Sequence, residues 1–162
     1  MIIAMTAGVQ QAQNNFNYEV DKFADIQILR YRVQGFEDLT PKQKELIYYL
    51  AQAAEAGRDI LFDQNYRYNI GIRKVLEEIY LNYKSDRNSE DFKQFEIYLK
   101  RIWFSNGIHH HYSMDKFKPE FSEDFLNRAY DKLSEDAKNN ITNYFISHIF
   151  GNRVDFIHFT DI

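Results

Sequence analysis

The chain has 162 residues, of which 44% are hydrophobic and 27% are charged, and its formal net charge at pH 7 is -4. These values are typical of a globular chain and exclude an intrinsically disordered one. No run of lysine and arginine is longer than two residues, so the sequence predicts no nucleic-acid partner, and the absence of cysteine excludes disulfides and thiolate zinc sites.

The first 17 residues differ in composition from the rest of the chain. They carry no charge and are small and apolar up to Val9. This pattern is typical either of the end of a secretory signal peptide, with Ala7 and Ala12 as candidate cleavage positions, or of a flexible N-terminus. The first interpretation favours an exported or periplasmic protein over a cytoplasmic one. We therefore separate 1–17 from a helical region over 18–162, and no stretch of either predicts a membrane span.

Only two prolines and six glycines interrupt the chain, which predicts a mainly α-helical fold. The segment Asp21–Val33 is predicted as a helix, although its isoleucines and valine also suit a strand. The clearest helix runs from Pro41 to about Phe62, because Thr40 and Gln43 form a capping box at its start. Apolar residues three and four apart give this helix one stripe for the core: Leu46, Tyr49, Leu50, Ala53, Ala54, Gly57, Ile60 and Leu61. Gly57 predicts a helix break or a backbone that passes close by.

Four further helices are predicted after this one, over 69–84, 90–104, 121–134 and 134–150. The last three follow serines that can serve as N-caps, with acidic residues in each first turn: Ser89, Ser122 and Ser134. The Asn106-Gly107 pair is expected to end the helix over 90–104. Three consecutive histidines, His109 to His111, then lie in a loop or a short extended piece. His148 falls on the apolar stripe of the last helix, which predicts a hydrogen-bonded core histidine.

The histidine run has three possible meanings: a metal site, part of a substrate pocket, or ordinary loop residues. In an extended segment His109 and His111 share a face and could bind a metal with a third ligand such as His148 or Asp115. The H-E-x-x-H motif of zinc peptidases, the G-x-S-x-G motif and a glycine-rich phosphate loop are all absent. The residues themselves therefore favour hydrogen-bonding loop residues, and they predict no catalytic and no metal-binding residue in this chain.

Two segments, "AAEAGRDILFDQ" and "WFSNGIHHHYSMDKFKPEF", belong to a longer resemblance over Phe23–Ser122. This region resembles the N-terminal part of the dipeptidyl-peptidase III family, and its bacterial branch most closely. Members of that family are zinc-dependent exopeptidases that remove dipeptides from peptide N-termini, and they have two lobes around a cleft. The resemblance implies that this chain is a helical, bundle-like part of such a two-lobed metallopeptidase. The family's zinc is held by an H-E-x-x-G-H motif and a later glutamate, which this chain lacks.

The resemblance also implies where this chain meets substrate. It places the histidine run beside the cleft, with Tyr112 in contact with bound peptide and with Asn106, His109 and His111 lining or supporting the groove. The segment between Asn106 and Tyr112 is one residue shorter than in distant relatives. The implied partners are a peptide substrate and the remainder of the peptidase, without which the chain is expected to be inactive. The apolar end of the chain, 151–162, agrees with an incomplete domain.

The alternative to a peptidase fragment is a free-standing helical module without catalytic activity. Aromatic residues make up 17% of the chain, which is rich for a helical domain and suits a surface that packs against a protein partner. The sequence alone leaves both interpretations open.

Overall fold

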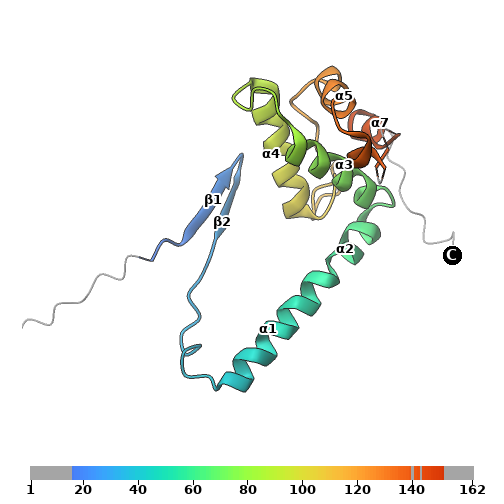
Figure 1. Cartoon of the computed structure of the whole chain (residues 1–162). Helices are drawn as coiled ribbons and strands as arrows, with labels where there is room; N and C mark the ends of the chain where they lie inside the picture. Colours follow the sequence, from blue (N-terminus) through green and yellow to red (C-terminus); the bar gives the residue numbers. More distant parts are fainter. Residues whose placement is uncertain (1–15, 140, 143, 152–162) are drawn as a thin grey trace, which may run out of the picture. The chain divides into compact units, whose positions relative to one another are not determined.

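The computed structural model describes residues 16–139, 141–142 and 144–151, and the chain divides into two units, 1–35 and 36–162. The described residues are mainly helical, as the sequence predicts (Figure 1). Residues 1–15 of the predicted signal remnant or flexible N-terminus, and residues 152–162 of the apolar end, lie outside the described residues. Where the structure describes the chain, no helix combines the length and the apolar character that crossing a membrane requires.

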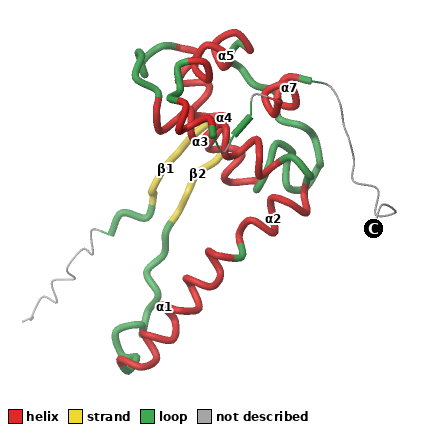
Figure 2. Tube along the Cα trace, turned by 45° about the vertical axis from the view of Figure 1, so that its right-hand side comes forward, coloured by secondary structure: helices red, strands yellow, loops and turns green. Residues whose placement is uncertain are grey.

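The first unit contains a β-hairpin, so the helix predicted over Asp21–Val33 is wrong. Strand β1 (Glu19–Phe23) pairs antiparallel with β2 (Ile26–Leu29), and Phe23 lies opposite Ile26 (Figure 2, yellow). The turn between the strands uses Ala24 at a φ of 48°, a conformation that glycine or asparagine usually supplies. In β2, partly buried isoleucines alternate with exposed residues, which is the pattern of a strand.

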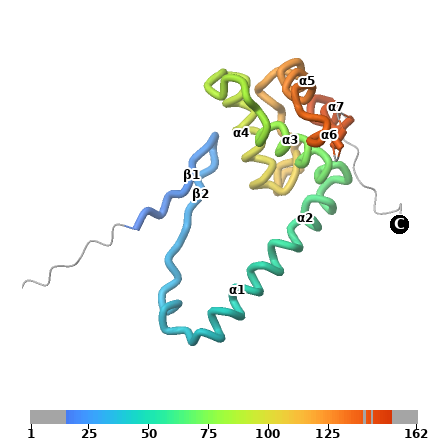
Figure 3. Tube along the Cα trace, viewed as in Figure 1, coloured from blue at the N-terminus to red at the C-terminus, as the bar shows by residue number. Residues whose placement is uncertain are grey.

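Two helices begin the second unit and follow one another along the chain (Figure 3). Helix α1 (Pro41–Ala56) starts with the predicted capping box, since the Thr40 amide donates to Oε1 of Gln43 over 2.9 Å. Helix α2 (Arg58–Asn65) begins directly after Gly57. A Cβ at Gly57 would lie no nearer than 3.6 Å to the atoms around it. Gly57 therefore marks a helix break, and no close backbone requires a glycine there.

The apolar stripe of α1 and α2 is exposed, whereas the sequence predicts it in the core. Helix α1 contains no buried residue, and Phe62 is the one buried residue of α2. Between 51% and 60% of each large apolar residue of this stripe is exposed, and we call these residues the α1–α2 apolar surface: Leu46, Tyr49, Leu50, Ile60 and Leu61. The periodicity was sufficient to predict the helix, but it does not identify which element covers the stripe.

The core of the second unit is built around α3 (Asn69–Asn82), which contacts α2, α4, α5 and α7. The surrounding helices are α4 (Glu90–Ser105), α5 (Glu123–Asp131), α6 (Glu135–Lys138) and α7 (Tyr144–Phe150). The predicted apolar faces of α3 and α4 are buried, and each such side chain contributes about 1.5–3 kcal/mol relative to exposure: Ile72, Val75, Leu76, Ile79, Phe92, Phe95, Leu99 and Ile102.

Two of the three predicted serine caps make a capping hydrogen bond. Ser122 accepts from the amide of Phe125 and Ser134 accepts from the amide of Ala137. Ser89 occupies the N-cap position of α4 as predicted, but its hydroxyl donates to the carbonyl of Asp86 over 2.8 Å and makes no capping hydrogen bond to the helix.

The helix predicted from Ser134 to Phe150 is also wrong in its extent. Helix α6 ends at Lys138, and α7 begins only at Tyr144. The sequence between them includes Asn139, Ile141 and Thr142, which are weaker helix formers than Ala, Leu or Lys. A capping signal followed by such residues stabilises one helical turn, but the helix does not extend beyond that turn.

Candidate functional site

The histidine run lies in a short loop that begins where α4 ends. Asn106 adopts the left-handed conformation (φ 55°, ψ 40°), and Gly107 has a φ of 150°. The Asn106-Gly107 pair therefore ends the helix as predicted. The chain then folds back on itself, with an antiparallel bridge between His109 and Lys116. We call residues 106–117 the histidine loop.

The two arms of the histidine loop are tied together by backbone hydrogen bonds. The amide of Phe117 donates to the carbonyl of Ile108, and the amide of His110 donates to the carbonyl of Asp115, each over 2.8 Å. At the tip, Nδ1 of His110 accepts from the amides of Tyr112 and Ser113, each over 3.2 Å. The loop thus has a defined conformation of its own, with part of the histidine run in the predicted short extended piece.

Asn69 anchors the histidine loop to the helical core. Only 1% of this residue is exposed, and its Nδ2 donates to the carbonyls of Phe62 (3.1 Å) and Asn106 (3.4 Å). Its Oδ1 accepts from the amide of Ile108 over 3.2 Å. One buried side chain therefore connects α2, the start of α3 and the loop. The sequence pattern does not single out this residue, because an asparagine at a helix start usually signals only a cap or a turn.

The histidines occupy different environments within the loop. His109 is half-buried against the edge of the Tyr66 ring, with 5.2 Å between ring centroids, and its Nδ1 has no hydrogen-bond partner within the part of the chain that the structure describes. His111 is exposed and packs beside Phe104, with Nδ1 3.4 Å from Oγ of Ser105. Among the described residues, no group of three or more His, Asp or Glu side chains lies close enough together to hold a metal ion.

Tyr112 lies at the tip of the histidine loop and is 84% exposed. The exposure shows that the Tyr112 side chain lies outside the helical core. Asn106, another residue expected near substrate, uses its carbonyl to accept from Asn65 and Asn69. The backbone of Asn106 therefore has a structural role, and contact of Asn106, His109, His111 or Tyr112 with peptide stays a prediction.

Replacing Tyr112 with alanine is expected to change the free energy of unfolding by less than about 0.5 kcal/mol, because the ring is almost fully exposed. Tyr98 is the matched control, since it is only 3% exposed and its truncation should cost about 3 kcal/mol or more. Urea denaturation of the two variants and the parent chain measures both values. A large loss for Tyr112→Ala would show that the tyrosine belongs to the core.

The chemistry of His109 is set by its burial and by its neighbour Lys116. Desolvation, with a contribution from the Lys116 charge, lowers the pKa of His109 below 6.5. Lys116 donates to the carbonyl of His148 over 2.6 Å and to the carbonyl of Gly151, which places its charge at the C-terminal end of α7. The half-buried ammonium thereby ties the histidine loop to α7, and its own pKa is lowered by desolvation.

The pH dependence of stability should report on His109. Below about pH 6.5 the unfolded chain binds a proton at this position more readily than the folded chain, so acidification favours unfolding and this contribution to stability is regained as the pH rises. Urea midpoints at about pH 7.5 and about pH 5.5 measure the loss. The difference should be smaller in His109→Gln, and equal differences in both proteins would refute the assignment.

His148 agrees with the prediction of a satisfied core histidine. It is half-buried on α7, and its Nδ1 lies 3.2 Å from the hydroxyl of Tyr66. Its ring also packs against Tyr68, with 4.3 Å between centroids. These contacts give His148 a packing role between α7 and the segment that precedes α3.

Comparison with models of known protein families and with curated proteins gave no match.

Proposed function

We propose that this chain is the N-terminal part of a zinc-dependent dipeptidyl-peptidase and that it contributes a wall of the substrate cleft. The resemblance of Phe23–Ser122 to the dipeptidyl-peptidase III family supports this function. The observation that carries it is the exposure of Tyr112 at the tip of an anchored loop. The alternative explanation of the histidine run, a self-contained metal site, lacks a third ligand among the described residues.

The histidine loop has the physical properties that peptide binding requires. Tyr112 offers an aromatic face and a hydroxyl, which suit a peptide's apolar side chains and its backbone. Its ring lies 4.2 Å from that of His111, which in turn packs beside Phe104. Because hydrogen bonds already fix the loop backbone, binding would cost little ordering entropy.

The α1–α2 apolar surface supports a second part of the proposal, the remainder of the peptidase. Large exposed apolar patches mark protein or membrane contacts, ligand grooves or aggregation-prone surfaces, and we assign this one to a protein contact. In this proposal the remainder completes a two-lobed fold and would hold the zinc, whose chemistry there would be to activate water for hydrolysis. This chain then binds and positions the peptide and takes no direct part in the chemical step.

The isolated chain is expected to release no dipeptide from an Arg-Arg-type chromogenic substrate, with or without added zinc, because it lacks the H-E-x-x-G-H motif. The measurement is an absorbance assay on the purified chain, with the variant carrying His109→Ala and His111→Ala as the control. Zinc-dependent turnover by the parent chain above that control would contradict the proposal.

The α1–α2 apolar surface also favours a second candidate, a free-standing helical module that binds a protein partner. The two functions are distinguished by the nucleotide sequence downstream of the codon for Ile162. An open frame that continues into an H-E-x-x-G-H motif supports the peptidase. A stop codon, together with a monodisperse purified chain, supports the module.

A further inference from the structure

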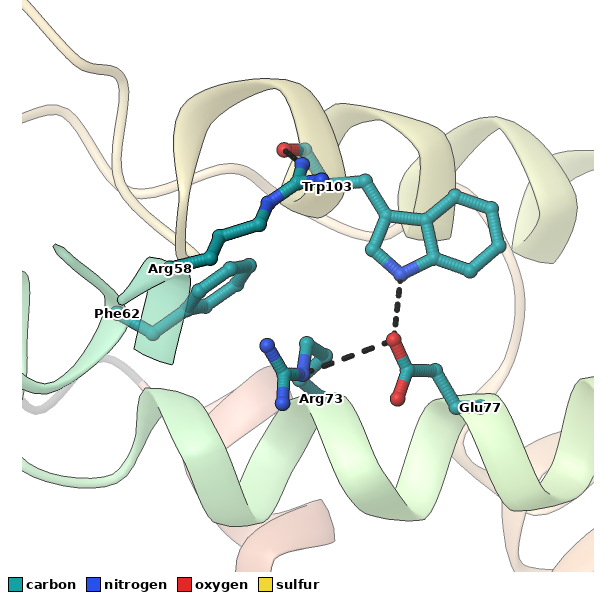
Figure 4. Close-up of a pocket in the computed structure, with 5 residues that line it drawn as sticks. All are labelled: Arg58, Phe62, Arg73, Glu77 and Trp103. Carbon is teal, nitrogen blue, oxygen red and sulfur yellow. Dashed lines mark hydrogen bonds and ion pairs between the residues drawn. The ribbon is translucent and has the colours of Figure 1, made fainter. Parts of the chain in front are cut away.

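A cavity of about 320 Å³ lies among α2, α3 and α4 and belongs to neither the histidine loop nor the α1–α2 apolar surface. Figure 4 shows its five lining side chains around a common space. Arg58 and Phe62 come from α2, Arg73 and Glu77 from α3, and Trp103 from α4. A cavity of this size is near the lower limit for small-molecule sites, so it would hold one small ligand.

Four of the lining residues form a fixed polar and aromatic frame. The guanidinium of Arg73 lies over the Phe62 ring, 4.5 Å from its centroid, and pairs with Asp59 over 2.8 Å. Glu77 accepts from the indole Nε1 of Trp103 over 2.8 Å, and its carboxylate lies 3.6 Å from Nε of Arg73. The Arg73 charge is therefore offset by two carboxylates, and the frame is held by contacts among all three helices.

Two cationic groups of the cavity have donors left over. Nε of Arg73 is buried and has no hydrogen-bond acceptor in the part of the chain that the structure describes, because 3.6 Å to Glu77 is an ion-pair distance and too long for a hydrogen bond. Arg58 is exposed and donates from one terminal nitrogen to the carbonyl of Trp103 over 3.1 Å. A guanidinium has five N–H donors, so most of those on Arg58 remain.

Two arginines and two carboxylates, those of Asp59 and Glu77, leave no net charge around the cavity, but the charges are unevenly distributed and favour an anion at Arg58. Arg58 makes no ion pair among the described residues, whereas Arg73 has Asp59 and Glu77. The positive charge without an ion-pair partner among the described residues thus stands at Arg58, which donates to the backbone carbonyl of Trp103. Guanidinium groups bind carboxylates in a bidentate manner, and an indole face accepts an apolar group next to that carboxylate.

We propose that this cavity binds a single carboxylate attached to a small apolar group, with Arg58 as the anchor of the carboxylate and Trp103 as the apolar wall. The carboxylate could belong to a free organic acid or to the C-terminal residue of a peptide, which share this chemistry. The inference rests on the cavity and does not depend on the proposed peptidase function.

The single tryptophan of the chain makes the site directly observable, since the spectrum contains one indole N–H resonance and it belongs to a lining residue. The experiment titrates the isotope-labelled full chain with phenylpropionate and with its neutral analogue phenylpropionamide, and follows that resonance by NMR. We expect a saturable shift with the acid, with a dissociation constant on the order of 1 mM as for a small fragment, and at least about tenfold weaker binding of the amide. A second pair of probes, Gly-Gly-Phe with a free and with an amidated C-terminus, shows whether a peptide carboxylate enters as well.

Arg58→Gln should weaken binding of the acid about tenfold while the chain stays folded, because Arg58 is exposed and glutamine keeps a donor for the Trp103 carbonyl. Arg67→Gln is the matched control, since Arg67 stacks over Tyr68 and does not line the cavity. The proposal is overturned if no probe gives a saturable shift, if acid and amide bind equally, or if Arg58→Gln binds the acid as the control does. Binding of the free acid without the peptide assigns the site to small acids, and binding of both assigns it to terminal carboxylates in general.

Discussion

Replacing Gly107 with alanine is expected to lower the free energy of unfolding by about 4 kcal/mol, from backbone strain and overpacking together. Gly107 has a φ of 150°, which residues with a side chain rarely adopt. A Cβ there would also lie only 2.1 Å from Nδ2 of Asn69, whose side chain is fixed by its hydrogen bonds. Urea denaturation followed by circular dichroism measures the loss.

Gly57→Ala is the control for this result. Gly57 has a φ of -81°, and the space around it accepts a methyl group. The same substitution should there leave stability unchanged or raise it by about 0.5–1 kcal/mol, because alanine favours the helix over the unfolded chain. Equal changes in the free energy of unfolding for both variants would contradict the positive φ and the close contact with Asn69 at Gly107.

Asn69→Ala should cost about 2–3 kcal/mol, which is the second large effect that we expect. The change removes the acceptor of the buried Ile108 amide and the donor that links Phe62 and Asn106. Hydrogen exchange at the Ile108 amide should accelerate together with the loss of stability. Asn82→Ala is the matched control, because among the described residues the Asn82 side chain bonds only to Glu78 of its own helix at the surface.

The double variant Asn69→Ala/Gly107→Ala tests the mechanism behind both values. Without the Asn69 side chain, a methyl group at residue 107 loses its closest obstacle, and only the backbone strain remains. The cost of Gly107→Ala should therefore be smaller in the Asn69→Ala background, by at least about 1 kcal/mol. Strictly additive costs would show that the two residues do not contact each other.

The sequence was sufficient to predict the helices whose signals are local. The structure confirms the signals that depend on neighbouring residues alone. These are the capping residues Thr40, Ser122 and Ser134 and the Asn106-Gly107 helix stop. The exposure of Tyr112 could also be predicted, because the residue falls outside every apolar stripe. The β-hairpin could not be predicted, because its turn contains Ala24 and lacks the glycine or asparagine that usually signals a hairpin turn.

Sequence patterns do not predict features that depend on residues far apart in the sequence. The role of Asn69 depends on contacts between α2, α3 and the histidine loop. The loop residues that Asn69 contacts lie 37 and 39 positions after it in the sequence. The cavity at Arg58 and Trp103 likewise joins residues 45 positions apart. The stripe of α1 predicts a helix correctly, but periodicity contains no information on what covers it.

The most direct test of the proposed function is the kinetics of Tyr112 variants in the chain joined to a downstream zinc-binding part. Tyr112→Ala should raise KM and lower kcat/KM about tenfold with little change in kcat, because contact area is lost in the ground state and in the transition state alike. Tyr112→Phe should retain most of the activity, and Leu81→Ala, at an exposed position of α3, should retain all of it. Unchanged kcat/KM in Tyr112→Ala, in an enzyme as stable as the parent, would contradict a peptide-binding role for the histidine loop.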